Sequence, residues 1–163
     1  MSTREHEALG KVERTAEGCT LTFERRFHAS RAEVWRALTE PAGLAGWLAD
    51  ATVDPRVGGE LELRFDDGTV HGRITELEPS RAFAYSWHEG GPSESHVRFE
   101  LAPDGAGTLL TLVHVRLEPA SASGFSAGWH HHLERLAASV AGGDLDWSWE
   151  RFEELKARYE PAA

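Results

Sequence analysis

The 163-residue sequence predicts a single α+β domain in which a curved antiparallel sheet wraps around a long C-terminal helix. Two observations carry this prediction. The middle of the chain holds two hairpin signals that place apolar residues on one face of the sheet, and an aromatic-rich helical stretch follows them. A sheet with one apolar face has to be covered, and the stretch from Phe125 to Val140 is the obvious cover. A strongly curved sheet around one helix leaves room for a ligand between them.

The N-terminal part of the chain predicts two strands joined by a turn. Residues 9–14 are weakly strand-like, and we interpret residues 1–18 as an N-terminal extension or an edge strand. Residues 16–18 favour a turn, after which residues 21–27 read as a longer strand with apolar positions along it.

Two short helices are expected next. Ser30 and Glu33 have the spacing of a capping box, in which each side chain satisfies an orphan backbone N–H. Thr39 is placed to cap a second short helix with Pro41 near its first turn, where the missing N–H costs nothing. The buried stripe of this second helix follows i, i+3, i+4 spacing and consists of Leu44, Trp47 and Leu48.

The middle of the chain predicts an antiparallel meander. Asp67-Gly68 is the strongest short hairpin signal in the sequence. A two-residue turn there pairs Phe65 with Val70, and the apolar residues further along both strands then share one face. Residues 83–87, with alternating aromatic side chains, form the next strand.

Asp104-Gly105 predicts a second hairpin by the same test. A turn there pairs Phe99 with Leu110, and again the apolar faces agree. A one-residue slip would destroy that agreement, so both hairpins support a sheet with one apolar face.

The last third of the chain is predicted to be helical. Apolar residues over 125–140 follow helical spacing, and Gly142-Gly143 stops that helix. A final helix is expected over 146–159, within a C-terminal addition at residues 144–160. We treat residues 1–163 as one domain.

Composition excludes several classes of partner. The formal net charge is −10, whereas phosphate binding needs a clustered surplus of Lys and Arg, so nucleic acid and anionic lipid are not expected partners. Cys19 is the one cysteine, which rules out an intramolecular disulfide and fits a reduced, cytoplasmic setting. Residues 1–10 are polar and no apolar run is long enough to span a bilayer, so neither secretion nor membrane insertion is expected.

A set of motifs along the chain resembles a known family. The longest, FHASRAEVWRALTEPAGLAGWL, runs from Phe27 to Leu48. The others follow in order and are Val57-Gly58-Gly59, Glu78-Pro79-Ser80-Arg81, Ser86-Trp87, Gly107-Thr108-x-Leu110-Thr111-Leu112-x-His114 and Gly128-Trp129. Together they span about residues 21–140 and resemble the family named for activators of the heat-shock-protein-90 ATPase, in the SRPBCC or START-like superfamily. The Gly10-Lys-Val start and the Trp-Glu-x-Phe end resemble bacterial members of this group.

The resemblance implies a helix-grip fold, also called START-like or birch-pollen-allergen-like, with two short helices after the first long strand. Its superfamily binds lipids, polyketides and other apolar molecules, and some members are enzymes. The family name comes from a eukaryotic co-chaperone whose separate chaperone-contacting domain has no room in this chain. The name is therefore poor evidence for chaperone work here.

The ligand cavity is expected between the apolar face of the sheet and the helices. Aromatic N–H and O–H groups and an imidazole need partners when buried, and such polar tips on an apolar wall are typical of a ligand pocket and of a satisfied core alike. The predicted cavity residues are Trp47, Leu63, Phe65, Tyr85, Trp87, Val97, Phe99, Leu112, His114, Phe125, Trp129 and Leu133. No catalytic residue is assigned, and His114 and Tyr85 are weak candidates for an acid or base.

The run His130-His131-His132 invites a metal interpretation. Adjacent helical residues point about 100° apart, so the three side chains cannot bind one ion, and we expect no metal and no cofactor. His132 is expected at the cavity edge, and His130 and His131 in solvent. Surface ion pairs with Glu62, Glu76 or Glu100 explain Arg25, Arg64 and Arg98. Arg25 also shares the apolar face of its strand and, if it points inward, is a candidate for binding a ligand carboxylate.

Three functions from different classes fit these features. The first is binding of a small hydrophobic or amphipathic ligand in the cavity, without catalysis. The second is a co-chaperone-like interaction module that stimulates an Hsp90-type ATPase. The third is a small-molecule enzyme, of cyclase, hydrolase or dehydratase type, that uses a cavity His or Tyr. We favour the first, while the ligand and the oligomeric state are not predicted by the sequence.

Overall fold

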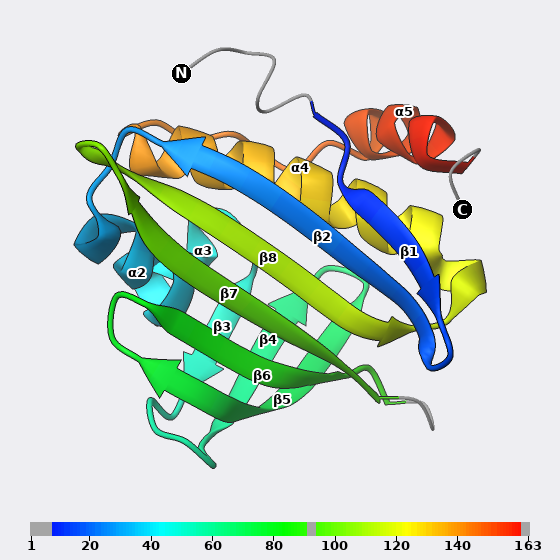
Figure 1. The fold of residues 1–163 in the computed structure, drawn as a ribbon, viewed down its shortest axis with the longest axis horizontal. Coiled ribbons are helices and arrows are strands. Elements are labelled where there is room, and N and C mark those ends of the chain that lie inside the picture. Colours follow the sequence, from blue (N-terminus) through cyan, green and yellow to red (C-terminus); the bar gives the residue numbers. More distant parts are fainter. Residues whose placement is uncertain (1–7, 91–93, 161–163) are drawn as a thin grey trace.

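The computed structural model describes residues 8–90 and 94–160 (Figure 1). Within these residues one antiparallel sheet has the strand order β1-β2-β8-β7-β6-β5-β4-β3. The strands are β1 (Lys11–Thr15), β2 (Gly18–Phe27), β3 (Asp50–Val53), β4 (Glu60–Phe65), β5 (Gly68–Glu78), β6 (Ala82–His88), β7 (Glu94–Asp104) and β8 (Gly107–Leu117). The helices are α2 (Arg31–Thr39), α3 (Pro41–Ala45), the 3-10 turn η1 (Pro119–Ser121), α4 (Ala122–Val140) and α5 (Trp149–Tyr159).

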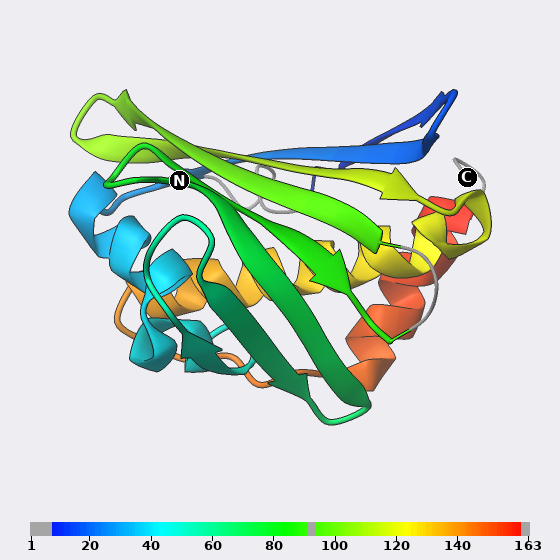
Figure 2. The same ribbon diagram turned by 90° about the horizontal axis from the view of Figure 1, so that it is seen from below.

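The sheet curves around α4, which lies in its concave side (Figure 2). The two short helices α2 and α3 follow β2 and precede β3 in the chain, and they lie at one end of the sheet. Helix α5 packs against α4. The predicted α+β helix-grip architecture is therefore confirmed. None of the helices within the described residues is long and apolar enough to cross a membrane.

Both predicted hairpins form, but each register differs from the prediction by two residues. In the first, Phe65 pairs with Gly68 and the turn is Asp66-Asp67. The reason is Gly68, whose φ of 155° is a conformation that L side chains rarely adopt, so the glycine opens β5 instead of lying inside the turn. Because side chains alternate with a period of two, the shift leaves every apolar residue on the predicted face.

The second hairpin differs in the opposite direction. Phe99 pairs with Leu112, and the turn is Gly105-Ala106. Gly105 has a φ of 58° at the first central position of the turn, where positive φ favours glycine. The concave face again keeps its apolar residues.

The helix boundaries follow local capping. Ser30 caps α2 by accepting the backbone N–H of Glu33 at 3.2 Å, which is one half of the predicted capping box. The Glu33 carboxylate accepts from the Ser30 hydroxyl at 3.2 Å. Thr39 does not cap α3, because it still belongs to the last turn of α2, where its hydroxyl donates to the carbonyl of Trp35 at 2.8 Å. The last helix starts later than predicted, at Trp149, because Ser148 takes the N-cap position and accepts the N–H of Arg151. The short strand β3 was not predicted from the sequence.

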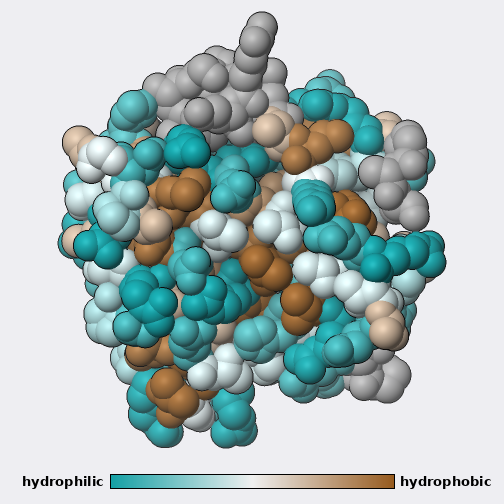
Figure 3. Space-filling model, in the orientation of Figure 1, coloured by the Kyte–Doolittle hydropathy of each residue, from teal (hydrophilic) through white to brown (hydrophobic). Residues whose placement is uncertain are grey.

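The outer face of the sheet mixes separate groups of hydrophobic residues with hydrophilic ones (Figure 3). Arg98 lies on this face and pairs with Glu76 at 2.8 Å and with Glu100 at 3.0 Å. Arg64 pairs with Glu62 at 2.9 Å, which confirms the prediction of a surface ion pair. The buried apolar core lies on the other face of the sheet, around α4.

Candidate ligand-binding groove

A groove of about 780 Å³ opens at one end of the concave side. One wall is the β4–β5 hairpin with the end of β6, and the other is formed by α4 and the start of α5. The Phe and Trp side chains that line it are Phe65, Trp87, Phe125, Trp129, Trp147, Trp149 and Phe152. We call this space the groove.

The structure divides the predicted cavity residues into two groups. Phe65, Trp87, Phe125 and Trp129 line the groove. The others are buried in the core away from it and are Trp47, Leu63, Tyr85, Val97, Phe99, Leu112, His114 and Leu133. The space between the sheet and the helix is filled along most of its length because large rings meet there, as Phe99 and Trp129 do at 5.8 Å between centroids. The groove is the open part, at one end.

His114 belongs to the core and not to the groove. The indole N–H of Trp129 donates to its Nδ1 at 2.9 Å, and an indole nitrogen can only donate. The imidazole proton is therefore on Nε2, which donates to the hydroxyl of Ser95 at 2.8 Å. Burial lowers the pKa of His114 to about 3. With both nitrogens engaged and the side chain fully buried, His114 has no free position from which to act as a base.

Tyr85, the other catalytic candidate, is equally enclosed. It is 1% exposed, its hydroxyl has no hydrogen-bond partner within the described residues, and burial raises its pKa. Its ring stacks on Trp87 at 6.4 Å between centroids. Tyr85 thus packs against a residue that lines the groove, Trp87, but does not line the groove itself.

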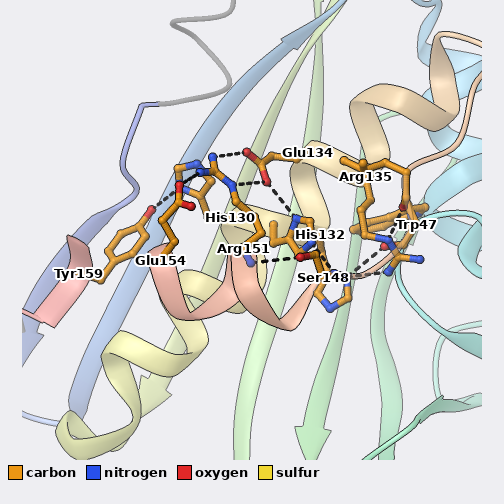
Figure 4. A network of polar contacts seen from close by, with 11 residues as sticks. Trp47, His130, His132, Glu134, Arg135, Ser148, Arg151, Glu154 and Tyr159 are labelled. Atoms are coloured by element: carbon orange, nitrogen blue, oxygen red, sulfur yellow. Dashed lines mark hydrogen bonds and ion pairs between the residues drawn. The ribbon is translucent and has the colours of Figure 1, made fainter. Parts of the chain in front are cut away.

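Of the three consecutive histidines of α4, His130 and His131 contact α5 and its N-cap residue, whereas His132 contacts the backbone at Trp47. Figure 4 shows His130 beside Tyr159 and His132 beside Trp47. The prediction that His130 and His131 lie in solvent is wrong, since they are 0% and 2% exposed. Nδ1 of His130 lies 2.8 Å from the hydroxyl of Tyr159 at the end of α5. Nε2 of His131 accepts the backbone N–H of Ser148 at 3.0 Å, so its Nδ1–H donates to the carboxylate of Glu134. These contacts bury the imidazoles because α5 lies over them.

His132 is the one histidine of the three that reaches the groove. Its Nδ1 lies 3.0 Å from the backbone carbonyl of Trp47, which only accepts, so the proton is on Nδ1. Arg135 Nη1 lies 3.3 Å from the same nitrogen and cannot donate to it in that tautomer. Burial, with a smaller effect of Arg135, lowers the pKa of His132 to about 3, so the ring is neutral.

Arg25 points inward, as its strand position suggested, but not into the groove. Its guanidinium donates to the backbone carbonyls of Ala8 at 2.7 Å and Glu24 at 3.0 Å and lies over the ring of Phe23. A ligand carboxylate in the groove would not meet it.

No group of three His, Cys, Asp or Glu side chains within residues 8–90 and 94–160 is arranged to hold a metal ion. The groove instead offers aromatic surface with polar groups at its rim, among them Arg135 and Lys156 on one wall and Asp66 and Asp67 on the other. Such a lining suits a molecule with an apolar body and a polar end.

Sequence reasoning missed the small residues that make room for the groove. Gly124 and Gly128 line it, and a Cβ added to either would meet nothing within 4 Å. Gly124 lies eight and Gly128 four positions before His132, on one stripe of α4. This i, i+4, i+8 spacing is the sequence signal for such a stripe. Glycine inside a helix ordinarily indicates only a less stable helix, so the spacing alone does not predict a groove.

Known proteins share this architecture. Residues 28–141 match the family described as Activator of Hsp90 ATPase homolog 1-like protein. The crystal structure of CalU16 from Micromonospora echinospora is 26% identical, with a TM-score of 0.76 and 94% of each chain covered. Protein MLL2253 from Mesorhizobium loti is 27% identical, with a TM-score of 0.72, and the match covers 77% of this chain and 99% of that one.

The Aha1 dimer from Colwellia psychrerythraea is 20% identical, with a TM-score of 0.70 and coverage of 76% and 97% of the two chains. A likeness at that identity shows the fold alone. No curated protein matches the chain.

Proposed function

The chain belongs to the family of activator of Hsp90 ATPase homolog 1-like proteins, and from this premise we propose that it binds a small hydrophobic or amphipathic molecule in the groove. The observation that carries the proposal is an aromatic-lined space of about 780 Å³. Small-molecule sites typically have volumes of about 300–1,000 Å³, with apolar walls and a few polar groups.

The two candidate acid–base residues do not reach the groove. His114 and Tyr85 lie in the core with no access to the groove, so neither is a base or acid for a ligand held there. A chaperone partner and a cytoplasmic location stay predictions from the sequence.

Filling the groove from α4 is the test. Gly128→Leu places a branched side chain where a Cβ has open space, so we expect it to weaken ligand binding at least tenfold. Replacing a helical glycine should leave the free energy of unfolding unchanged or raise it by about 0.5–1 kcal/mol. A native mass-spectrometry screen of fatty acids, naphthalene derivatives and other apolar molecules, run on both proteins, gives the readout.

Gly128→Ala is the matched control, because one methyl group adds little volume and makes the same change to the helix. It should keep every ligand that the wild-type protein retains. Equal binding by the Leu and Ala variants would place the ligand elsewhere, and retention of no compound by the wild-type protein would reject the proposal.

A further inference from the structure

His132 presents an unprotonated ring nitrogen at the wall of the groove. Because its proton is on Nδ1, facing the carbonyl of Trp47, Nε2 carries the lone pair. Nε2 has no hydrogen-bond partner within the described residues. Unlike Nε2 of His130, it is not shut off from solvent. The groove therefore contains a hydrogen-bond acceptor to which no protein group within the described residues donates.

The ring of His132 is held in one orientation. Trp147 stacks on it at 4.5 Å between centroids with an interplanar angle of 27°, and Phe65 packs against it at 5.9 Å. Together with the Trp47 carbonyl, these rings fix where Nε2 points. An acceptor fixed in advance loses little freedom when a ligand arrives, so it contributes to affinity and to selectivity.

The surroundings of this acceptor are aromatic. Trp147, Phe65 and Trp129, the last at 6.3 Å from His132, all line the groove beside it. Aromatic rings pack best on other rings, in stacked or edge-to-face arrangements. A ligand that lies against these rings and brings no donor leaves Nε2 unpaired and out of water, which costs affinity.

We propose that the groove selects aromatic molecules that carry a hydroxyl or N–H donor, and that this donor bonds to Nε2 of His132. The inference rests on the proposed function and narrows its ligand class. A ligand carboxylate at the same position is disfavoured, because it would set a second acceptor against the lone pair.

A matched pair of probes distinguishes binding of an aromatic ligand in the groove from selection of a ligand with a hydrogen-bond donor. 2-Naphthol and 2-methoxynaphthalene have the same ring system, but only the first has a donor. We expect the wild-type protein to bind 2-naphthol about tenfold more tightly in titrations followed by calorimetry, the value of one well-placed hydrogen bond in a site shielded from water. Equal binding of the two, or binding of neither, would overturn the inference; the proposed function stands as long as the wild-type protein retains any apolar compound of the screen.

His132→Phe keeps an aromatic ring for Trp147 to stack on and removes the acceptor. It should remove the preference, so that the two probes bind with about equal affinity. A fall in affinity for both probes alike would show that His132 only shapes the groove, and would overturn the inference. His71→Phe, on the outer face of the sheet, is the control and should keep the wild-type preference.

A measurement on the wild-type protein tests the inference without relying on the folding of a variant. The ¹⁵N resonance of His132 Nε2 should move on addition of 2-naphthol and stay in place with 2-methoxynaphthalene. A resonance that stays in place while 2-naphthol binds would equally overturn the inference.

Discussion

Acidification from pH 7 to pH 5 is expected to lower the free energy of unfolding by about 5 kcal/mol, because three buried histidines are kept neutral by the fold. Burial is the largest cause in each case and lowers the pKa of His114 and His132 to about 3 and that of His130 to about 4. In the unfolded chain the same groups titrate near pH 6.5.

The sign follows from proton uptake. Near pH 5 the unfolded chain holds close to three more protons on these residues than the folded chain does, and about half as many more at pH 6.5, so stability falls as the pH falls. Three protons correspond to about 4 kcal/mol per pH unit near pH 5. Glu134 acts lower on the scale, since its pKa is lowered to about 2 and its contribution is lost only below about pH 4.

Urea denaturation followed by tryptophan fluorescence at pH 7, 6 and 5 measures this effect. His132→Phe should reduce by about one the difference in bound protons that sets the slope of stability against pH. Equal stability at pH 7 and pH 5 would contradict the neutral, buried state of the three imidazoles.

Glu134→Ala is expected to destabilise the protein by about 2–3 kcal/mol, because the carboxylate is the junction that ties α5 to α4. It accepts from Arg151 Nη2 at 2.6 Å and from Nδ1 of His131 at 2.9 Å. Burial opposes its ionisation, but these hydrogen bonds outweigh burial and lower its pKa to about 2. Its loss leaves the His131 donor with no carboxylate.

Glu154→Ala is the matched control, because Glu154 pairs with the same Arg151 at 2.6 Å from an exposed position on α5. An exposed pair of this kind contributes about 0.5 kcal/mol or less. Chemical denaturation gives both values, and hydrogen exchange should show earlier opening of α5 in Glu134→Ala. Equal costs for the two variants would mean that the junction adds nothing beyond a surface pair.

The sequence predicted the sheet faces better than the strand registers, and there is a physical reason. Alternation of apolar residues such as Leu61 and Leu63 determines which side of the sheet is buried, but it is satisfied equally by registers two residues apart. The choice between those registers depends on the backbone of single residues, Gly68 and Gly105, whose φ values are not visible in a pattern.

The position of the groove was predicted only in part, for a related reason. Periodicity identifies side chains that face the interior, yet it cannot tell a ring that lines a space, such as Trp87, from one that fills it, such as Phe99. The space depends on Gly124 and Gly128, which withhold side chains. The histidine run was misjudged because the contacts that bury His130 and His131 come from α5, whose placement over α4 no local signal showed.

The six tryptophans provide the most direct test of the groove as the binding site. Trp87, Trp129, Trp147 and Trp149 line the groove, whereas Trp35 and Trp47 lie outside its lining. In a ¹H–¹⁵N spectrum of the indole N–H groups, titration with 2-naphthol should shift the first four resonances and leave those of Trp35 and Trp47 in place. Binding that moves Trp35 or Trp47 while the four groove tryptophans stay fixed would contradict the account.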